Sequence, residues 1–325
     1  MTTSKHLLAL LRSHIDEDND QFLSVALQMA ASEARKGHGK VATELRSIVE
    51  EARSKKRVQT ARPIALAQPK GDLAELLSAS YSETRLSSMV LTPDLSLRLM
   101  RIIHEHRQQR RLAEHGLKPR RKVLLIGPPG AGKTMTASAL AGELSLPLFT
   151  VVFESLMTRF MGETAAKLRL VFEAMRQTRG VYFFDEFDAI GAKRTGTNDV
   201  GEVRRILNSF LQLLENDDSD GLIVAATNHP ELLDPALFRR FDDVIEYEIP
   251  TNEIAKGILK ARLRTFDTTD LDWDAVVDAT SGYSQAELAR VAADAAKSSV
   301  LDGRTIISLA DFNTAISDRK RSSRA

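Results

Sequence analysis

One stretch decides the fold of this chain: Val123-Leu-Leu-Ile126-Gly127-Pro-Pro-Gly130-Ala-Gly132-Lys133-Thr134. Four apolar residues lead into a glycine-rich loop, and apolar residues at helical spacing follow, from Ala137 to Leu144. Glycine permits the backbone conformations that turn several N–H groups toward one anion. The helix that follows adds the positive end of its dipole. The stretch therefore predicts a strand, a phosphate-binding loop and a helix.

The polar residues of this loop predict what it binds. In the pattern G-x-x-x-x-G-K-T, the lysine, here Lys133, reaches the β- and γ-phosphates, and the hydroxyl of Thr134 ligates Mg²⁺. The alternative is a glycine turn that serves structure alone. We expect the nucleotide to contact Gly127, Pro128, Pro129, Gly130, Ala131, Gly132, Lys133, Thr134 and Met135.

The composition limits the classes of function. A chain of 325 residues suits two or three structural units. Its 45 Lys and Arg nearly balance its 44 Asp and Glu, so no overall charge favours nucleic acid or a membrane. Cysteine is absent, which excludes disulfides and thiol chemistry. No apolar run approaches the roughly 20 residues of a transmembrane helix, and no signal peptide is evident. We expect a cytoplasmic protein without a membrane contact.

The chain divides into four segments. Residues 1–58 show three runs with apolar residues at helical spacing, which predict a small helical domain. That domain is either a packing appendage or an adaptor that recruits a protein substrate. Residues 59–72 contain two prolines and a glycine without periodicity, which indicates a linker. An α/β core is predicted over 73–250, and a helical lid with a basic tail over 251–325.

Short apolar runs alternate with helical stretches after residue 122. Runs this short and this apolar are typical of strands buried on both faces, hence of a parallel sheet wrapped by helices. The predicted strands are Val123–Ile126, Leu148–Phe153, Val181–Phe184, Leu222–Ala226 and Val244–Ile249. The predicted lid helices are Glu253–Thr265, Trp273–Ala279, Gln285–Leu301 and Leu309–Ser317.

Residues 73–122 are predicted to be helical, notably Leu95–Leu112, and end in a basic cluster from Lys118 to Lys122. A solvated helix face explains this charge. Nucleic-acid binding is the alternative, but no aromatic residue is interleaved for stacking on bases.

Polar residues end two of the predicted strands. Asp185 and Glu186 follow Val181–Phe184 directly. At the carboxyl edge of an open α/β sheet, Asp185 can hold Mg²⁺ through water, and Glu186 can take a proton from the attacking water. Asn228 follows the strand of Leu222–Ala226 and either bonds the γ-phosphate or opens a turn. Arg239 and Arg240 are either surface charge or a source of positive charge for phosphoryl transfer.

Together these motifs resemble the AAA family of hexameric ATPases within the AAA+ superfamily, over about residues 85 to 320. Gly127–Thr134 matches its Walker A motif, Phe183–Glu186 its Walker B motif and Asn228 its sensor 1. The resemblance implies that Arg239 and Arg240 act as arginine fingers on a neighbouring subunit's nucleotide. It also implies ATP and Mg²⁺ as cofactors and a single-ring homo-oligomer, a hexamer.

Phe160-Met161-Gly162 resembles the family's pore loop, which grips polypeptide in the axial channel. The alternative is that Phe160 belongs to the core, because Phe153, Leu156 and Phe160 have helical spacing. One departure concerns the lid, where the family's Ser-Gly-Ala-Asp is Ser284-Gln285-Ala286-Glu287. The resemblance implies a chaperone-like ATPase that unfolds, threads or disassembles a protein. The alternatives are a nucleic-acid motor or loader and a nucleotide-gated structural switch.

Overall fold

The computed structural model describes residues 69–156, 163–188, 199–233 and 235–322, together with Met29, Ala30, Val41, Thr43 and Ser47. The chain divides into two compact units, Met1–Ile64 and Ala65–Ala325, and the second contains every feature described below. The predicted N-terminal helical domain and its linker lie largely outside the described residues. Within the described ranges, no helix is both long and apolar enough to cross a bilayer.

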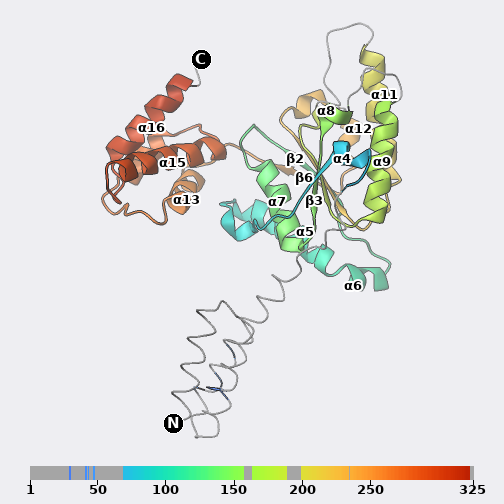
Figure 1. The fold of residues 1–325 in the computed structure, drawn as a ribbon, viewed down its shortest axis with the longest axis horizontal. Coiled ribbons are helices and arrows are strands. Elements are labelled where there is room, and N and C mark those ends of the chain that lie inside the picture. Colours follow the sequence, from blue (N-terminus) through green and yellow to red (C-terminus); the bar gives the residue numbers. More distant parts are fainter. Residues whose placement is uncertain are drawn as a thin grey trace. The chain divides into compact units, whose positions relative to one another are not determined.

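The described part of the core is built on one six-stranded sheet (Figure 1). The order across it is β1-β3-β4-β5-β2-β6, and every neighbouring pair is parallel except β1 with β3. This confirms the predicted α/β class with a mainly parallel sheet. Its strands are β1 (Leu77–Ser80), β2 (Lys122–Ile126), β3 (Leu148–Val151), β4 (Val181–Phe184), β5 (Leu222–Thr227) and β6 (Asp243–Glu246).

Helices cover both faces of this sheet. Alternate strand residues face opposite ways, so that Leu124 and Tyr182 pack on one side and Val123 and Val181 on the other. Helices α9 (Glu163–Gln177) and α11 (Asp199–Glu215) cover the first side, and α5 (Pro93–Arg107) and α7 (Lys133–Leu144) the second (Figure 1). Shorter elements are α4 (Leu73–Leu76), η2 (Leu86–Ser88), α6 (Gln109–Glu114), α8 (Phe153–Leu156), η3 (Pro230–Leu232) and α12 (Pro235–Phe238).

The sequence prediction was wrong at one end of the sheet. Residues 73–122 are not helical throughout, because β1 adds an antiparallel edge strand that pairs Leu77 with Val151. The four residues Leu-Ser-Ala-Ser carry one strongly apolar side chain, so their pattern is too weak to indicate a strand. The other strands lie where they were predicted, although β3 and β6 end earlier.

The C-terminal helices form the predicted lid with a core of its own (orange to red in Figure 1). They are α13 (Asn252–Arg262), α14 (Trp273–Ala279), α15 (Gln285–Leu301) and α16 (Leu309–Ser322). Ser284 and Glu287 form a capping box at the start of α15, in which each side chain bonds the other residue's N–H group. This cap fixes where the first turn of α15 begins.

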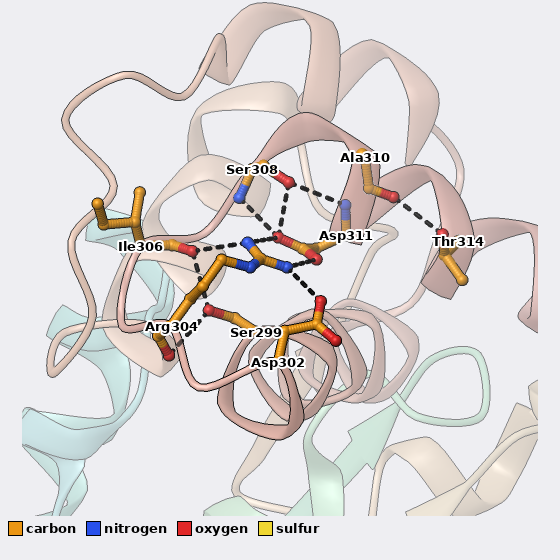
Figure 2. Close-up of polar contacts among 8 residues, drawn as sticks. All are labelled: Ser299, Asp302, Arg304, Ile306, Ser308, Ala310, Asp311 and Thr314. Carbon is orange, nitrogen blue, oxygen red and sulfur yellow. Dashed lines mark hydrogen bonds and ion pairs between the residues drawn. The ribbon is translucent and has the colours of Figure 1, made fainter.

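A closed polar cluster holds the loop between α15 and α16 (Figure 2). The Arg304 guanidinium donates to the carboxylates of Asp302 and Asp311, each at 2.8 Å, and to the Ile306 carbonyl at 3.2 Å. Asp311 also accepts from the backbone N–H of Ser308 at 2.8 Å. The Arg304 guanidinium and the Ser308 bonds hold the pKa of the Asp311 carboxyl far below its usual range.

Candidate active site

The predicted phosphate loop connects β2 to α7, and its glycines take the backbone conformations that the sequence predicts. Gly130 and Gly132 have φ angles of 75° and 102°, in the region that disfavours other residues. Gly127 is required for space, since a Cβ atom there would lie 2.4 Å from the Tyr247 carbonyl oxygen. Ala131 turns its side chain into the core. The loop therefore exposes backbone rather than side chains to the cavity beside it.

Lys133 is buried at the base of this loop, with 6% of its surface exposed. Its ammonium donates to the carbonyls of Gly127 at 2.6 Å and Pro128 at 2.9 Å, and to the amide oxygen of Asn228 at 2.7 Å. Burial lowers the pKa of Lys133, and the charges of Asp185 and Asp188 oppose that change. All three acceptors are neutral, so the ammonium keeps a net positive charge that a phosphate can use.

The two predicted magnesium residues meet at the sheet edge. The Thr134 hydroxyl donates to a carboxylate oxygen of Asp185 at 3.0 Å. Hydroxyl and carboxylate oxygens are hard donors of the kind that Mg²⁺ prefers, so this pair fits that ion. In the described residues, no group of three or more His, Cys, Asp or Glu could hold a metal. Mg²⁺ would therefore rely on phosphate and water oxygens as well, as it commonly does.

Glu186 has an unusual backbone. Its φ angle is 50°, the left-handed region, and its N–H donates to the Asp185 carboxylate at 3.0 Å. A non-glycine residue pays about 1 kcal/mol or more for this conformation. The following residue, Phe187, is fully buried, and its N–H bonds the Ala226 carbonyl at 2.8 Å. The turn thus sends Phe187 into the core while the Glu186 side chain stays exposed at the cavity.

The tip of β5 adds a connection that the sequence interpretation missed. The Asp188 carboxylate accepts the Thr227 hydroxyl at 2.9 Å and the Asn228 N–H at 3.4 Å. Asn228 in turn accepts from Lys133, so Asp188 positions Asn228 and, through it, the lysine. The signal was a second aspartate three residues after Asp185, at the same strand end. We call Asp188 a positioning residue because it reaches the cavity through Asn228.

A cavity of about 410 Å³ joins these residues to the lid. Pro129, Gly130 and Gly132 to Met135 line its loop side, with Asp185, Glu186 and Asn228 beside them. The other side is mainly apolar and was not predicted as a set of residues: Ser88, Met89, Val90, Ile258, Ala261, Arg262, Gln285, Ala286 and Ala289. A phosphate-binding loop facing an apolar wall suits a nucleotide, whose phosphates and base need these two environments.

The two candidate arginine fingers are adjacent in sequence but differ in their surroundings. Arg240 forms an ion pair with Glu215 at the end of α11. Arg239 is exposed and has no ion pair within the described part of the chain. Neither arginine lines the cavity described above. This placement leaves Arg239 available to another molecule.

Two further predictions concern the candidate pore loop and the basic residues between 107 and 122. The candidate pore residues Phe160, Met161 and Gly162 lie outside the described residues. In the basic segment, Arg107 pairs with Glu143 at 2.9 Å, and the buried Arg121 pairs with Asp217 at 3.3 Å. Arg120 lies within 4 Å of Glu105 and Asp243. Much of this positive charge is therefore neutralised locally, which favours the interpretation as a structural surface.

Comparison with known proteins gives several matches. A sequence model of the ATPase family associated with various cellular activities (AAA) matches residues 123–249. An uncharacterized AAA family ATPase of Sinorhizobium fredii is 34% identical over 323 residues, which cover 97% of this chain and 95% of that relative. The crystal structure of the FIGL-1 AAA domain superposes with a TM-score of 0.61 at 24% identity, over 79% of this chain and 91% of that one. The last match supports the fold.

Two other relatives are named for work on proteins. A proteasome-activating nucleotidase of Sulfurisphaera tokodaii is 40% identical over 212 residues, 62% of this chain and 54% of the relative. The ATP-dependent zinc metalloprotease FtsH of Acidothermus cellulolyticus is 34% identical over 251 residues, 74% of this chain and 38% of the relative. The chain therefore spans about half of the first relative and less of the second.

Proposed function

This chain belongs to the AAA family of ATPases and is an ATP hydrolase, and from that premise we propose that it remodels proteins. It assembles into a ring, a hexamer, and couples ATP hydrolysis to unfolding, threading or disassembly of a protein substrate. The observation that carries this proposal is the 40% identity to a proteasome-activating nucleotidase across 212 residues. A cytoplasmic location and recruitment of substrate through residues 1–58 belong to the same proposal.

In this proposal, the residues at the cavity divide the work of hydrolysis. When bound, Mg²⁺ would supply positive charge that offsets the charge of the phosphates. Thr134 and Asp185 would hold the ion, and Lys133 places its uncompensated charge at the β- and γ-phosphates. Glu186 accepts the proton of the attacking water from its exposed position at the strand end. Asn228, fixed by Asp188, orients the γ-phosphate or that water.

The environment of the arginines supports a site shared between subunits. Because Glu215 of the same chain engages Arg240, we assign Arg239 as the residue that reaches the neighbouring subunit's nucleotide. Positive charge from a second subunit stabilises the transition state, so that hydrolysis requires oligomerisation. Arg240 then positions Arg239 at the end of α12.

The substrate class is tested by the ATPase rate of the purified full-length protein. We expect an unfolded protein such as reduced, carboxymethylated casein to raise the rate, and single-stranded DNA and RNA of matched charge to leave it unchanged. Stimulation by nucleic acid alone would replace this proposal with the motor or loader. A rate that responds to neither would favour the nucleotide-gated switch.

The proposed pore loop has a separate test in Phe160→Ala. If Phe160 grips the substrate, the variant should keep basal ATP turnover and the melting temperature but lose remodelling of an unfolded protein. If Phe160 is a core residue, the same change should cost roughly 3–5 kcal/mol and lower the melting temperature. Normal melting with normal remodelling would remove the main support for threading.

A further inference from the structure

The lid contacts the glycines of the phosphate loop directly. The Ala286 N–H, in the first turn of α15, donates to the Gly130 carbonyl at 3.0 Å. A Cβ atom on Gly130 would lie 2.8 Å from the Ser284 hydroxyl oxygen and 3.0 Å from the Ala286 Cβ. The start of α15 and the loop are therefore packed as closely as glycine allows.

Gln285 occupies the centre of this contact. Its amide oxygen lies 3.1 Å, and its amide nitrogen 3.9 Å, from where a Cβ on Gly132 would be. The carboxamide thus rests against the backbone that precedes Lys133. Gln285 is half-buried and lines the nucleotide cavity between the loop and the apolar wall of Ile258 and Ala289.

The carboxamide makes no hydrogen bond to any other residue in the described ranges. Its neighbours on the helix are differently placed, since the Ser284 hydroxyl and the Glu287 carboxylate satisfy each other in the capping box. Gln285 therefore presents a donor and an acceptor to the cavity that the fold does not use. A polar side chain held in place by packing but without a protein partner is suited to a ligand.

We propose that the Gln285 carboxamide is a nucleotide-specificity residue that donates a hydrogen bond to an oxygen of the nucleotide between its base and its β-phosphate. Its position between the apolar wall and the phosphate loop fits the ribose and α-phosphate segment. Gln285 belongs to the lid, whereas the phosphate loop with Gly132 belongs to the core. A bond from Gln285 to the nucleotide would therefore connect the lid to a nucleotide held by the core. The inference rests on the proposed assignment of Gly127–Thr134 to the phosphates.

Four substitutions at Gln285 test this bond through equilibrium binding of ATP and of 2′-deoxy-ATP to the full-length protein, measured by calorimetry. Gln285→Ala and Gln285→Met should both raise the ATP Kd about tenfold, the usual value of a hydrogen bond to a charged or strongly polar group. Gln285→Glu should raise it further, because a carboxylate repels phosphate. Gln285→Asn should fall between Ala and the native residue.

The variant Gln285→Met separates hydrogen bonding from space filling, because methionine keeps the length and loses the amide. ATP binding by Gln285→Met equal to that of the native protein, or an unchanged Kd in both the Ala and Glu variants, would overturn the inference. A loss seen with ATP but not with 2′-deoxy-ATP assigns the bond to the ribose hydroxyl. An equal loss with both nucleotides assigns it to the phosphate or the remaining ribose oxygens, and either assignment supports the inference.

Two controls distinguish this inference from the proposed function. Arg290→Ala changes an exposed residue of the same helix away from the cavity and should leave the Kd unchanged. Lys133→Ala should abolish tight ATP binding. If Lys133→Ala binds ATP normally, the phosphate-loop assignment itself fails. If it loses binding while Gln285→Ala does not, the role of Gln285 alone fails.

Discussion

The polar cluster around Arg304 and the polar groups around Lys133 differ in the charge of their acceptors. Arg304 lies between the carboxylates of Asp302 and Asp311, so its charge is neutralised inside the lid (Figure 2). Lys133 donates to two carbonyls and one amide oxygen, which leave its charge uncompensated by direct contact. A buried or half-buried cation thus has two distinct uses. Arg304 closes a loop, whereas Lys133 remains available for an anion.

The two clusters also differ in their backbones. Ser308 and Asp311 begin α16 with a reciprocal pair of side-chain to backbone bonds, the geometry of an unstrained helix start. At the cavity, Glu186 adopts a left-handed conformation that costs energy and leaves its carboxylate exposed. Strain that the surrounding core enforces is common where a side chain must face a ligand.

The presence or absence of a carboxylate partner also distinguishes the adjacent arginines, and here we expect the greatest loss of ATP turnover. Arg240 has a carboxylate partner in its own chain and Arg239 has none among the described residues, so Arg239→Ala should lose on the order of 10³–10⁵ in ATP turnover. Arg240→Ala should lose less. Steady-state ATPase rates at saturating ATP measure both, with ATP binding as the check that each variant folds.

Mixing tests whether Arg239 acts on a neighbour. Combining Arg239→Ala with Glu186→Gln subunits should restore some activity, because some interfaces then hold an intact arginine beside an intact glutamate. Equal losses in Arg239→Ala and Arg240→Ala would remove the distinction drawn from Glu215. Full activity that is independent of protein concentration would falsify the shared site.

The next largest effect concerns the strained residue. Glu186→Gln keeps the size of the side chain and removes its basicity, so ATP binding should persist while turnover falls roughly 10²- to 10⁴-fold. Single-turnover hydrolysis with the binding constant measured in parallel separates these quantities. The control is Glu231→Gln, an exposed glutamate that does not line the cavity. A variant with normal turnover would leave Glu186 as a turn residue only.

The sequence predicted the parts of the site that reside in contiguous motifs. Strand, loop and helix at Gly127–Thr134 follow from glycine and apolar spacing, and Asp185 and Asn228 follow from polar residues at strand ends. What it could not predict is contact between distant segments. Gln285 and Gly132 lie 153 positions apart in the sequence, and no periodicity encodes their contact.

Two other omissions have different causes. The edge strand β1 is short and mostly polar, so it lacks the apolar run that revealed the central strands. Asp188 has the residue type of a ligand, but its role depends on Thr227 and Asn228, which the sheet brings beside it through the pairing of β4 with β5. Positioning residues of this kind become visible when the strand order is known.

The weakest effect that we expect is a loss of lid stability when the polar cluster around Arg304 is disrupted. Asp311→Ala removes one of the two carboxylate partners of Arg304 and the acceptor of the Ser308 N–H, and the loss of that last bond alone costs roughly 1 kcal/mol. The lid contains the single tryptophan of the chain, Trp273, so its fluorescence during urea unfolding reports on this region. Asp294→Ala, which removes an exposed pair with Lys297, is the matched control and should change little.

The pH dependence of lid stability gives a second test of the Arg304–Asp311 pair. The pKa of Asp311 lies below its usual value in the folded lid, so the unfolded chain takes up the proton first as the pH falls. The stability that Asp311 contributes is therefore complete above about pH 4, the ordinary pKa of an aspartate, and is lost progressively below it. The unfolding midpoint followed by Trp273 should fall more steeply below pH 4 in the native protein than in Asp311→Ala. If the midpoint falls equally with pH in the two proteins, the Arg304–Asp311 pair contributes nothing to lid stability. Arg304 and Lys133 would then differ only in whether their charge is neutralised by a carboxylate.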